Sequence, residues 1–195
     1  MDESPDTDEE TAPPPRPPAL IAAAFATCGV GLLEARHAEG LLALARDAAA
    51  PRVTEFKMAY VHAFWAVAQA HPRAVGAAEV ARLVMATLLF VASARVLVQV
   101  RDTGWLWRQA LAGNALVTLA AAWHERSMRG AWLAAYERAI ATAPAAIAPP
   151  QKGLAMADAI RLQLTASVGV TGLLGLLFLA ALAFAMRPQT RAATG

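Results

Sequence analysis

The residues most able to bind a metal or a haem are few in this chain of 195 residues. Its histidines are His37, His62, His71 and His124. A zinc protease places two histidines four residues apart around a glutamate, but the residue four after His124 is Met128. His37 and Glu39 are two residues apart and would not share a helix face. We therefore expect no metal, haem or other cofactor.

Cys28 is the one cysteine, and it lies in an apolar stretch without a neighbouring base that would activate the thiol. We expect it to pack as a small apolar side chain, because unreactive cysteines behave in this way. Gly29 and Gly31 are not followed by the Gly-Lys-Ser/Thr of a phosphate-binding loop, and no Gly-x-Ser-x-Gly motif of a hydrolase is present. These absences favour a protein that is not an enzyme.

Four polar side chains stand inside otherwise apolar stretches: Arg95, Arg108, Asn114 and Gln163. Arg95 is close to the end of its stretch, where a long side chain can reach the lipid headgroups; the alternative is a buried Arg95 paired on another helix. Asn114 and Gln163 can bridge neighbouring helices by hydrogen bonds. Transport paths usually need acids near the middle of the membrane, and these stretches contain none. Structural roles are therefore favoured over a transport path.

Small side chains recur in the last apolar stretch, where Ser167, Thr171 and Gly175 are four residues apart and Gly172 borders them. Small residues let two helix backbones approach closely in lipid. The spacing predicts a helix contact, either within a bundle or between two copies of the chain. The alternative is that alanine and glycine are merely abundant here.

The elements that must position these residues are apolar helices. The chain is 57% apolar and 16% charged, with a mean hydropathy of +0.41. Four stretches are candidate membrane spans, at about 19–35, 83–100, 105–123 and 162–186. The last has no charge and would reach about 37 Å, more than the ~30 Å hydrocarbon core of a membrane. The first is short, and the alternative is a buried or interfacial helix, which would leave three spans.

The third stretch is bracketed by Trp105, Trp107 and Trp123, as expected for side chains at the two membrane interfaces. Two further segments, at about 53–70 and 130–142, carry apolar residues at helical spacing. We expect two amphipathic helices there, lying either in the membrane interface or on the bundle. Residues 142–153, rich in Ala and Pro, are expected to form a linker.

The two ends of the chain differ from this apolar body. Residues 1–18 hold six acids, six prolines and one base, Arg16, and are expected to form a disordered acidic tail. Residues 188–195 are expected to be a short tail, so the membrane domain would cover 19–187. The remaining bases are scattered instead of forming a patch, which argues against nucleic-acid binding.

Together these features predict an all-α integral membrane bundle of about four helices in two antiparallel pairs. The richness in Ala and Arg is typical of a bacterium with a GC-rich genome, so we expect a multi-pass protein of the inner membrane. The function we expect is a non-enzymatic scaffold or accessory subunit that contacts the bilayer and either a second copy or another membrane protein. The alternative is a transporter or channel component that attracts an anion with Arg95 and Arg108. A membrane enzyme built around His124 and Glu125 is less favoured.

Overall fold

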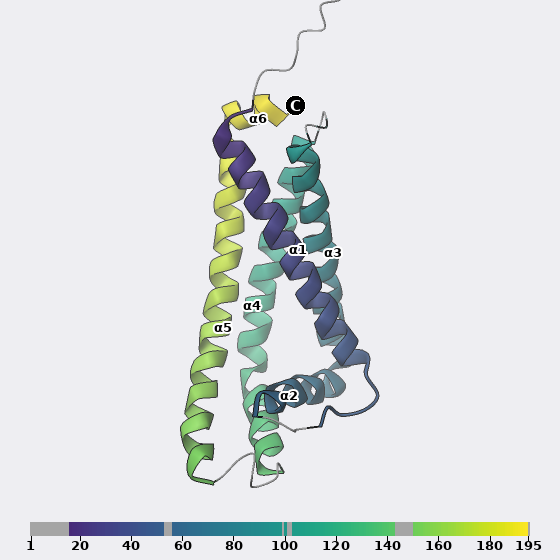
Figure 1. Cartoon of the computed structure of the whole chain (residues 1–195), viewed down its shortest axis with the longest axis vertical. Coiled ribbons are helices and arrows are strands. Elements are labelled where there is room, and N and C mark those ends of the chain that lie inside the picture. Colours follow the sequence, from purple (N-terminus) through teal and green to yellow (C-terminus); the bar gives the residue numbers. More distant parts are fainter. Residues whose placement is uncertain (1–15, 53–55, 99, 101–102, 143–149, 195) are drawn as a thin grey trace, which may run out of the picture.

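The computed structural model describes residues 16–52, 56–98, 100, 103–142 and 150–194. Its helices are α1 (Pro18–Arg46), α2 (Phe56–Ala70), α3 (Pro72–Leu97), α4 (Gly104–Ala141), α5 (Pro150–Ala185) and α6 (Pro188–Thr194) (Figure 1). Within these described ranges every regular element is a helix, so the predicted all-α class is confirmed.

Proline marks the start of four of the six helices: Pro18, Pro72, Pro150 and Pro188 begin α1, α3, α5 and α6. The first residue of a helix has no partner for its backbone N–H, and the proline ring already holds the helical φ angle. These helices therefore begin at positions where proline does not destabilise a helix. The predicted tail at 188–195 is accordingly mostly helical.

Four long helices form the bundle, with α1 and α3 as one antiparallel pair and α4 and α5 as the other (Figure 1). The short connection between α3 and α4 places those two helices side by side as well. The start of α1 and the short α6 lie at one end of the bundle, while α2 crosses the opposite end (Figure 1). We call these the terminal end and the α2 end.

The core of the terminal end is apolar and closely packed. Leu20, Leu89, Trp107 and Leu111 are almost completely buried there. Trp107 was expected at a membrane interface together with Trp105, but its side chain is 0% exposed and its Nε1 donates to Thr27 Oγ1 at 3.3 Å. Two residues along a helix correspond to about 200° of rotation, so Trp105 and Trp107 point to opposite sides.

Gly31 permits the closest approach of α1 to α3. A Cβ atom at this position would lie 2.8 Å from the backbone nitrogen of Phe90 and 2.9 Å from the carbonyl oxygen of Ala86. No side chain larger than hydrogen fits there without moving a backbone. The α1–α3 pair thus depends on a glycine in the same way as close helix pairs in membranes generally do.

Three helices of the described chain are long and apolar enough to cross a membrane: α1, α3 and residues Arg161–Ala185 of α5. The first apolar stretch belongs to this set, because its helix continues to Arg46 and is not short. The stretch at 105–123 is not in the set, since Arg108, Gln109 and Asn114 lower its hydropathy.

The two expected amphipathic helices have different outcomes. The described part of 53–70 forms α2, whose Ala59, Ala63 and Val67 pack against Ala135 and Tyr136 of α4. The apolar face of α2 therefore lies on the bundle. Residues 130–141 do not form a separate helix, because no proline interrupts the chain there and they continue α4. Residues 1–15 of the predicted acidic tail and residues 143–149 of the predicted linker lie outside the described residues. The linker prediction is wrong for residues 150–153, because they form the first turn of α5.

Candidate functional site

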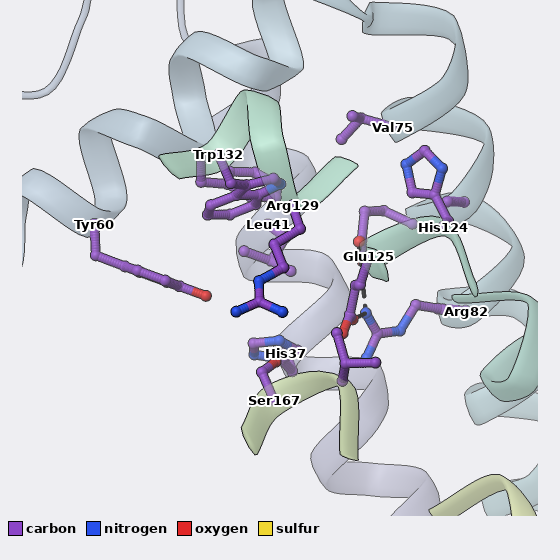
Figure 2. A pocket seen from close by; sticks show the side chains of 14 residues that line it. His37, Leu41, Tyr60, Val75, Arg82, His124, Glu125, Arg129, Trp132 and Ser167 are labelled. Carbon is purple, nitrogen blue, oxygen red and sulfur yellow. Dashed lines mark ion pairs between the residues drawn. The ribbon is translucent and has the colours of Figure 1, made fainter. Parts of the chain in front are cut away.

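A cavity of about 120 Å³ lies at the α2 end, enclosed by side chains from five helices. This volume holds several water molecules, since one needs about 10–15 Å³. Its polar lining includes His37 of α1, Tyr60 of α2, Glu79 and Arg82 of α3, Glu125 of α4 and Ser167 of α5 (Figure 2).

Arg82 is the centre of a charged cluster in the wall of this cavity. Its Nη2 lies 3.3 Å from Glu34 Oε2, and its Nη1 lies 3.6 Å from Glu79 Oε1 and 3.6 Å from Glu125 Oε1. The Arg82 side chain is only 11% exposed. Glu79 and Arg82 share a face of α3 because they are three residues apart, whereas Glu34 and Glu125 come from α1 and α4.

The fourth long helix joins this cluster through a neutral side chain. Thr171 of α5 donates a hydrogen bond from Oγ1 to Glu125 Oε2 at 3.3 Å, and Thr171 is buried. One connected group of side chains therefore links α1, α3, α4 and α5 at the same level of the bundle. Buried charges occur in proteins when they are paired and hydrogen-bonded in this way.

The charges of the cluster do not balance. Glu34, Glu79 and Glu125 bring three carboxylates against the single guanidinium of Arg82, which leaves an excess of two negative charges. Arg129 also lines the cavity, but in the described chain its one hydrogen-bond partner is the Arg161 carbonyl oxygen, at 3.5 Å. Glu34 does not line the cavity itself, whereas Glu79, Glu125, Arg82 and Arg129 do, so the lining holds two carboxylates against two guanidiniums.

Glu79 is the least satisfied member of the cluster. The residue is 6% exposed, and its Oε2 is buried with no hydrogen-bond partner among the described residues. Leaving a charged acceptor without a donor costs more than the roughly 1–3 kcal/mol typical of a neutral group. Glu79 is also one of the residues that line the cavity.

Aromatic rings form the side of the cavity beneath α2. The ring centroids of Tyr60 and Trp132 are 5.3 Å apart, and those of Phe64 and Trp132 are also 5.3 Å apart. Figure 2 shows the Arg129 guanidinium and the Tyr60 hydroxyl group pointing into the same space. Burial, and to a smaller extent the negative charge of Glu125, raises the pKa of Tyr60, so this side chain stays neutral well above pH 7.

His37 and His124 both line the cavity, but they are not arranged as metal ligands. In the part of the chain that the structure describes, no group of three or more His, Cys, Asp or Glu side chains is placed to hold a metal ion. The cavity therefore combines separate polar groups with aromatic faces.

The four polar residues singled out in the sequence lie elsewhere. Arg95 is exposed near the end of α3, and Arg108 lies in the first turns of α4, so both are at the terminal end. Asn114 is buried and donates from Nδ2 to the carbonyl oxygens of Met85, at 2.7 Å, and Ala110, at 2.8 Å, which joins α4 to α3. Gln163 is exposed on α5.

The predicted small-residue positions of α5 lie in different surroundings. Gly175 is buried, and a Cβ atom there would be 2.8 Å from Leu119 Cδ2 of α4. Thr171 bonds to Glu125 of the same helix α4, and Ser167 lines the cavity. Gly172 has no neighbouring atom within 4 Å of an added Cβ. Three of the four positions therefore face the interior of this bundle.

Sequence reasoning missed the charged cluster, because Glu34, Glu79, Arg82 and Glu125 lie at or beyond the limits of the apolar stretches. The sequence nevertheless contained a signal for this cluster in the positions of three of its residues. In an antiparallel bundle, the end of the first span, the start of the second and the end of the third meet at one level. Glu34, Arg82 and Glu125 occupy those three places.

Comparison with known proteins finds no matching family model, no similar curated protein and no similar solved structure. The function must therefore be inferred from the geometry of the cavity and of the helices that enclose it.

Proposed function

We propose that this chain is a multi-pass membrane protein that binds a small polar organic solute in the cavity at the α2 end. Its spans would be α1, α3, α5 and the first part of α4. The surface of α4 supports this fourth span, because Leu116 is 71% exposed and Trp123 is 74% exposed. Large apolar side chains are exposed in such numbers when they face lipid.

The level of the charged cluster fits the edge of such a membrane. The terminal end brings together the start of α1, the end of α3, the start of α4 and the end of α5 (Figure 1). Counted from there at about 1.5 Å per residue, Glu34, Arg82, Glu125 and Thr171 lie about 21–32 Å away. A hydrocarbon core of about 30 Å therefore ends near these residues, so the cavity opens close to the opposite interface.

One observation carries the proposal: a cavity large enough for a small solute is lined by members of a buried charged cluster, and one of them, Glu79, has a carboxylate oxygen with no hydrogen-bond partner among the described residues. A buried ion-pair cluster contributes little stability compared with apolar residues of the same volume. A purely structural role of the cluster would explain neither the carboxylate oxygen without a hydrogen-bond partner nor the cavity beside the cluster. Solute binding accounts for both features.

This proposal is compatible with the other expectations drawn from the sequence. A bacterial inner membrane remains our proposed location, on the basis of composition. A non-enzymatic role is retained, and binding to a second copy or another membrane protein is compatible with a solute site. Arg95 and Arg108, the residues of the proposed anion site, do not line the cavity at the α2 end, and we favour a solute site at that cavity.

Thermal unfolding of the purified protein in a neutral detergent tests the proposal. A panel of small amines, carboxylates, zwitterions and phosphate esters is added, and at least one class should raise the unfolding temperature, because a ligand stabilises the state that binds it. Ser167→Leu should abolish this shift by filling the cavity. Gln163→Leu, an exposed change on the same helix, should leave it intact. The proposal fails if every shift seen with the wild type persists in Ser167→Leu.

A further inference from the structure

We infer that the solute of this cavity is a small carboxylate with a short apolar substituent, whose carboxylate group binds Arg129 and Tyr60 and whose substituent lies against Trp132. This inference rests on the proposed function and specifies its ligand class. It follows from the pairing of the charges in the lining, from the unused hydrogen-bond donors and from the aromatic side of the cavity.

The charges that line the cavity are equal in number, but they are not all paired. Glu79 and Glu125 each lie 3.6 Å from Arg82, so both lining carboxylates have a guanidinium within ion-pair distance. Arg129 is the second guanidinium of the lining, and no carboxylate of the described residues lies within ion-pair distance of it. The place in the cavity that lacks a counter-charge is therefore beside Arg129, and the missing group is an anion.

Hydrogen bonding at this place also favours an acceptor. The Arg129 guanidinium presents a planar fork of N–H groups, and among the described residues it donates only to the Arg161 carbonyl oxygen, at the long distance of 3.5 Å. The hydroxyl group of Tyr60 has no hydrogen-bond partner in the described part of the chain and points into the same space (Figure 2). Burial, and less strongly the charge of Glu125, raises the pKa of Tyr60, so this hydroxyl group keeps its proton at neutral pH. A carboxylate accepts hydrogen bonds from both groups, and its pairs with arginine are frequently bidentate.

The rest of this side of the cavity is apolar, and the volume limits the size of the ligand. Trp132 contacts the rings of Tyr60 and Phe64, with 5.3 Å between centroids in both pairs, and Val75 is buried at the edge of the same cavity. The volume of about 120 Å³ is slightly less than the ~150 Å³ of a cavity that holds benzene. A carboxylate with a chain of about three carbons has as many non-hydrogen atoms as benzene, and its chain would cover the rings.

Titration calorimetry of the full chain in a neutral detergent tests this ligand class with three probes: butanoate, its neutral isostere butanamide, and acetate. We expect butanoate to bind about 10-fold or more tightly than butanamide, because only the carboxylate forms an ion pair with Arg129. Acetate should bind about 10-fold more weakly than butanoate, since it lacks the methylene groups that the rings would bury. Equal affinity for butanoate and butanamide would overturn the pairing with Arg129.

Substitutions of single side chains separate the role of Arg129 from effects on folding. Arg129→Gln should weaken butanoate binding by about 10-fold or more and change butanamide binding by less than about 2-fold, which a general loss of structure would not do. Tyr60→Phe, which removes the second donor and keeps the ring, should weaken butanoate binding by about 5-fold. Arg126→Gln is the matched control, because Arg126 is an exposed arginine of the same helix and does not line the cavity. It should change the affinity for butanoate by less than about 2-fold.

The outcomes separate this inference from the proposed function. If butanamide binds as tightly as butanoate and Ser167→Leu abolishes the binding of both, the ligand class is wrong, but the cavity still binds a solute. If Arg126→Gln weakens butanoate binding as much as Arg129→Gln does, the carboxylate is not bound at Arg129 and the inference is wrong. If none of the three probes binds, the inference fails, and the thermal comparison with Ser167→Leu decides separately on the cavity.

Discussion

At the scale of single residues, Arg82 is the side chain on which the other charges of the cluster depend. It is the only cation within ion-pair distance of Glu34, Glu79 and Glu125 among the described residues. Replacing it with methionine keeps the volume but leaves three carboxylates close together without a counter-charge. We expect Arg82→Met to lower the free energy of unfolding by about 3–5 kcal/mol, measured by circular dichroism during denaturation in detergent.

Arg161→Met is the matched control for that experiment. Arg161 also contacts two acids, Glu137 at 3.8 Å and Asp158 at 3.3 Å, but its side chain is 54% exposed. Exposed ion pairs contribute about 0–1 kcal/mol, so this change should be nearly neutral. Equal losses in the two variants would show that Arg82 does not hold a buried cluster.

The two tyrosines of the chain, Tyr60 and Tyr136, allow burial to be measured by titration. Burial raises the pKa of Tyr136 to about 12, and the pKa of Tyr60 is also raised. Ultraviolet absorbance of tyrosinate should therefore show both ionising above pH 10, and Tyr136→Phe should remove the later transition. A transition of Tyr136 near pH 10 in the folded protein would contradict its burial.

The same shifts predict how stability depends on pH. The folded state holds the tyrosine protons more tightly than the unfolded state does, so the stabilisation is fully present below pH 10. It is lost as the pH rises from 10 towards 12, because the unfolded chain ionises first. Tyr136→Phe should weaken this alkaline decline, which unfolding measurements at pH 9 and pH 11 can detect.

At the scale of elements, the pairing of α1 with α3 depends on Gly31. Gly31→Ala places a Cβ within 3 Å of two backbone atoms of α3, and overpacking of this kind costs about 1–3 kcal/mol. The expected result is a lower unfolding temperature in detergent.

Gly29→Ala is the control for this change. An added Cβ at Gly29 meets no atom within 4 Å, and alanine favours a helix by about 1 kcal/mol over glycine. Gly29→Ala should therefore leave the protein unchanged or more stable. If both substitutions destabilise to the same degree, close approach at Gly31 is not the cause.

The helices of this protein were largely predictable, because their signals are local. Runs of apolar residues indicate where α1, α3 and α5 lie, although α3 and α5 begin at Pro72 and Pro150, before the predicted spans at 83–100 and 162–186. The length of α4 was not predictable from the change in hydrophobicity near Trp123, since a helix continues through polar residues when nothing breaks it. The burial of Trp107 was likewise not predictable, because it depends on the helices packed against α4 and not on the hydrophobicity of residues 105–123.

The candidate site was less predictable, because it is made by long-range contacts. Glu79 and Arg82 lie before the predicted span at 83–100 and were not placed on a helix, and Glu34 and Glu125 join them only after the helices pack. The aromatic side of the cavity needs α2 to fold back onto α4, which no local signal specifies. Side chains at the ends of apolar stretches therefore need to be compared across helices before they are assigned to loops.

At the scale of the whole molecule, the described chain begins and ends at the terminal end of the bundle, and the cavity lies at the other (Figure 1). With four spans, the two chain ends would be on one side of the membrane and the cavity on the opposite side. If α4 did not cross, the cavity and the C-terminal end would not be separated in this way. Sidedness and solute access can therefore be tested together.

The most direct test is cysteine labelling of Ser167→Cys in a Cys28→Ala background, in sealed vesicles of both orientations with a membrane-impermeant thiol reagent. We predict labelling only from the side opposite to a C-terminal tag, and slower labelling in the presence of a solute that raises the unfolding temperature of the protein. Gln163→Cys, on the exposed surface of α5, should show no such protection. Labelling of Ser167→Cys from the side of the tag, or at a rate that no solute changes, would contradict a solute-binding cavity at the far end of a four-span bundle.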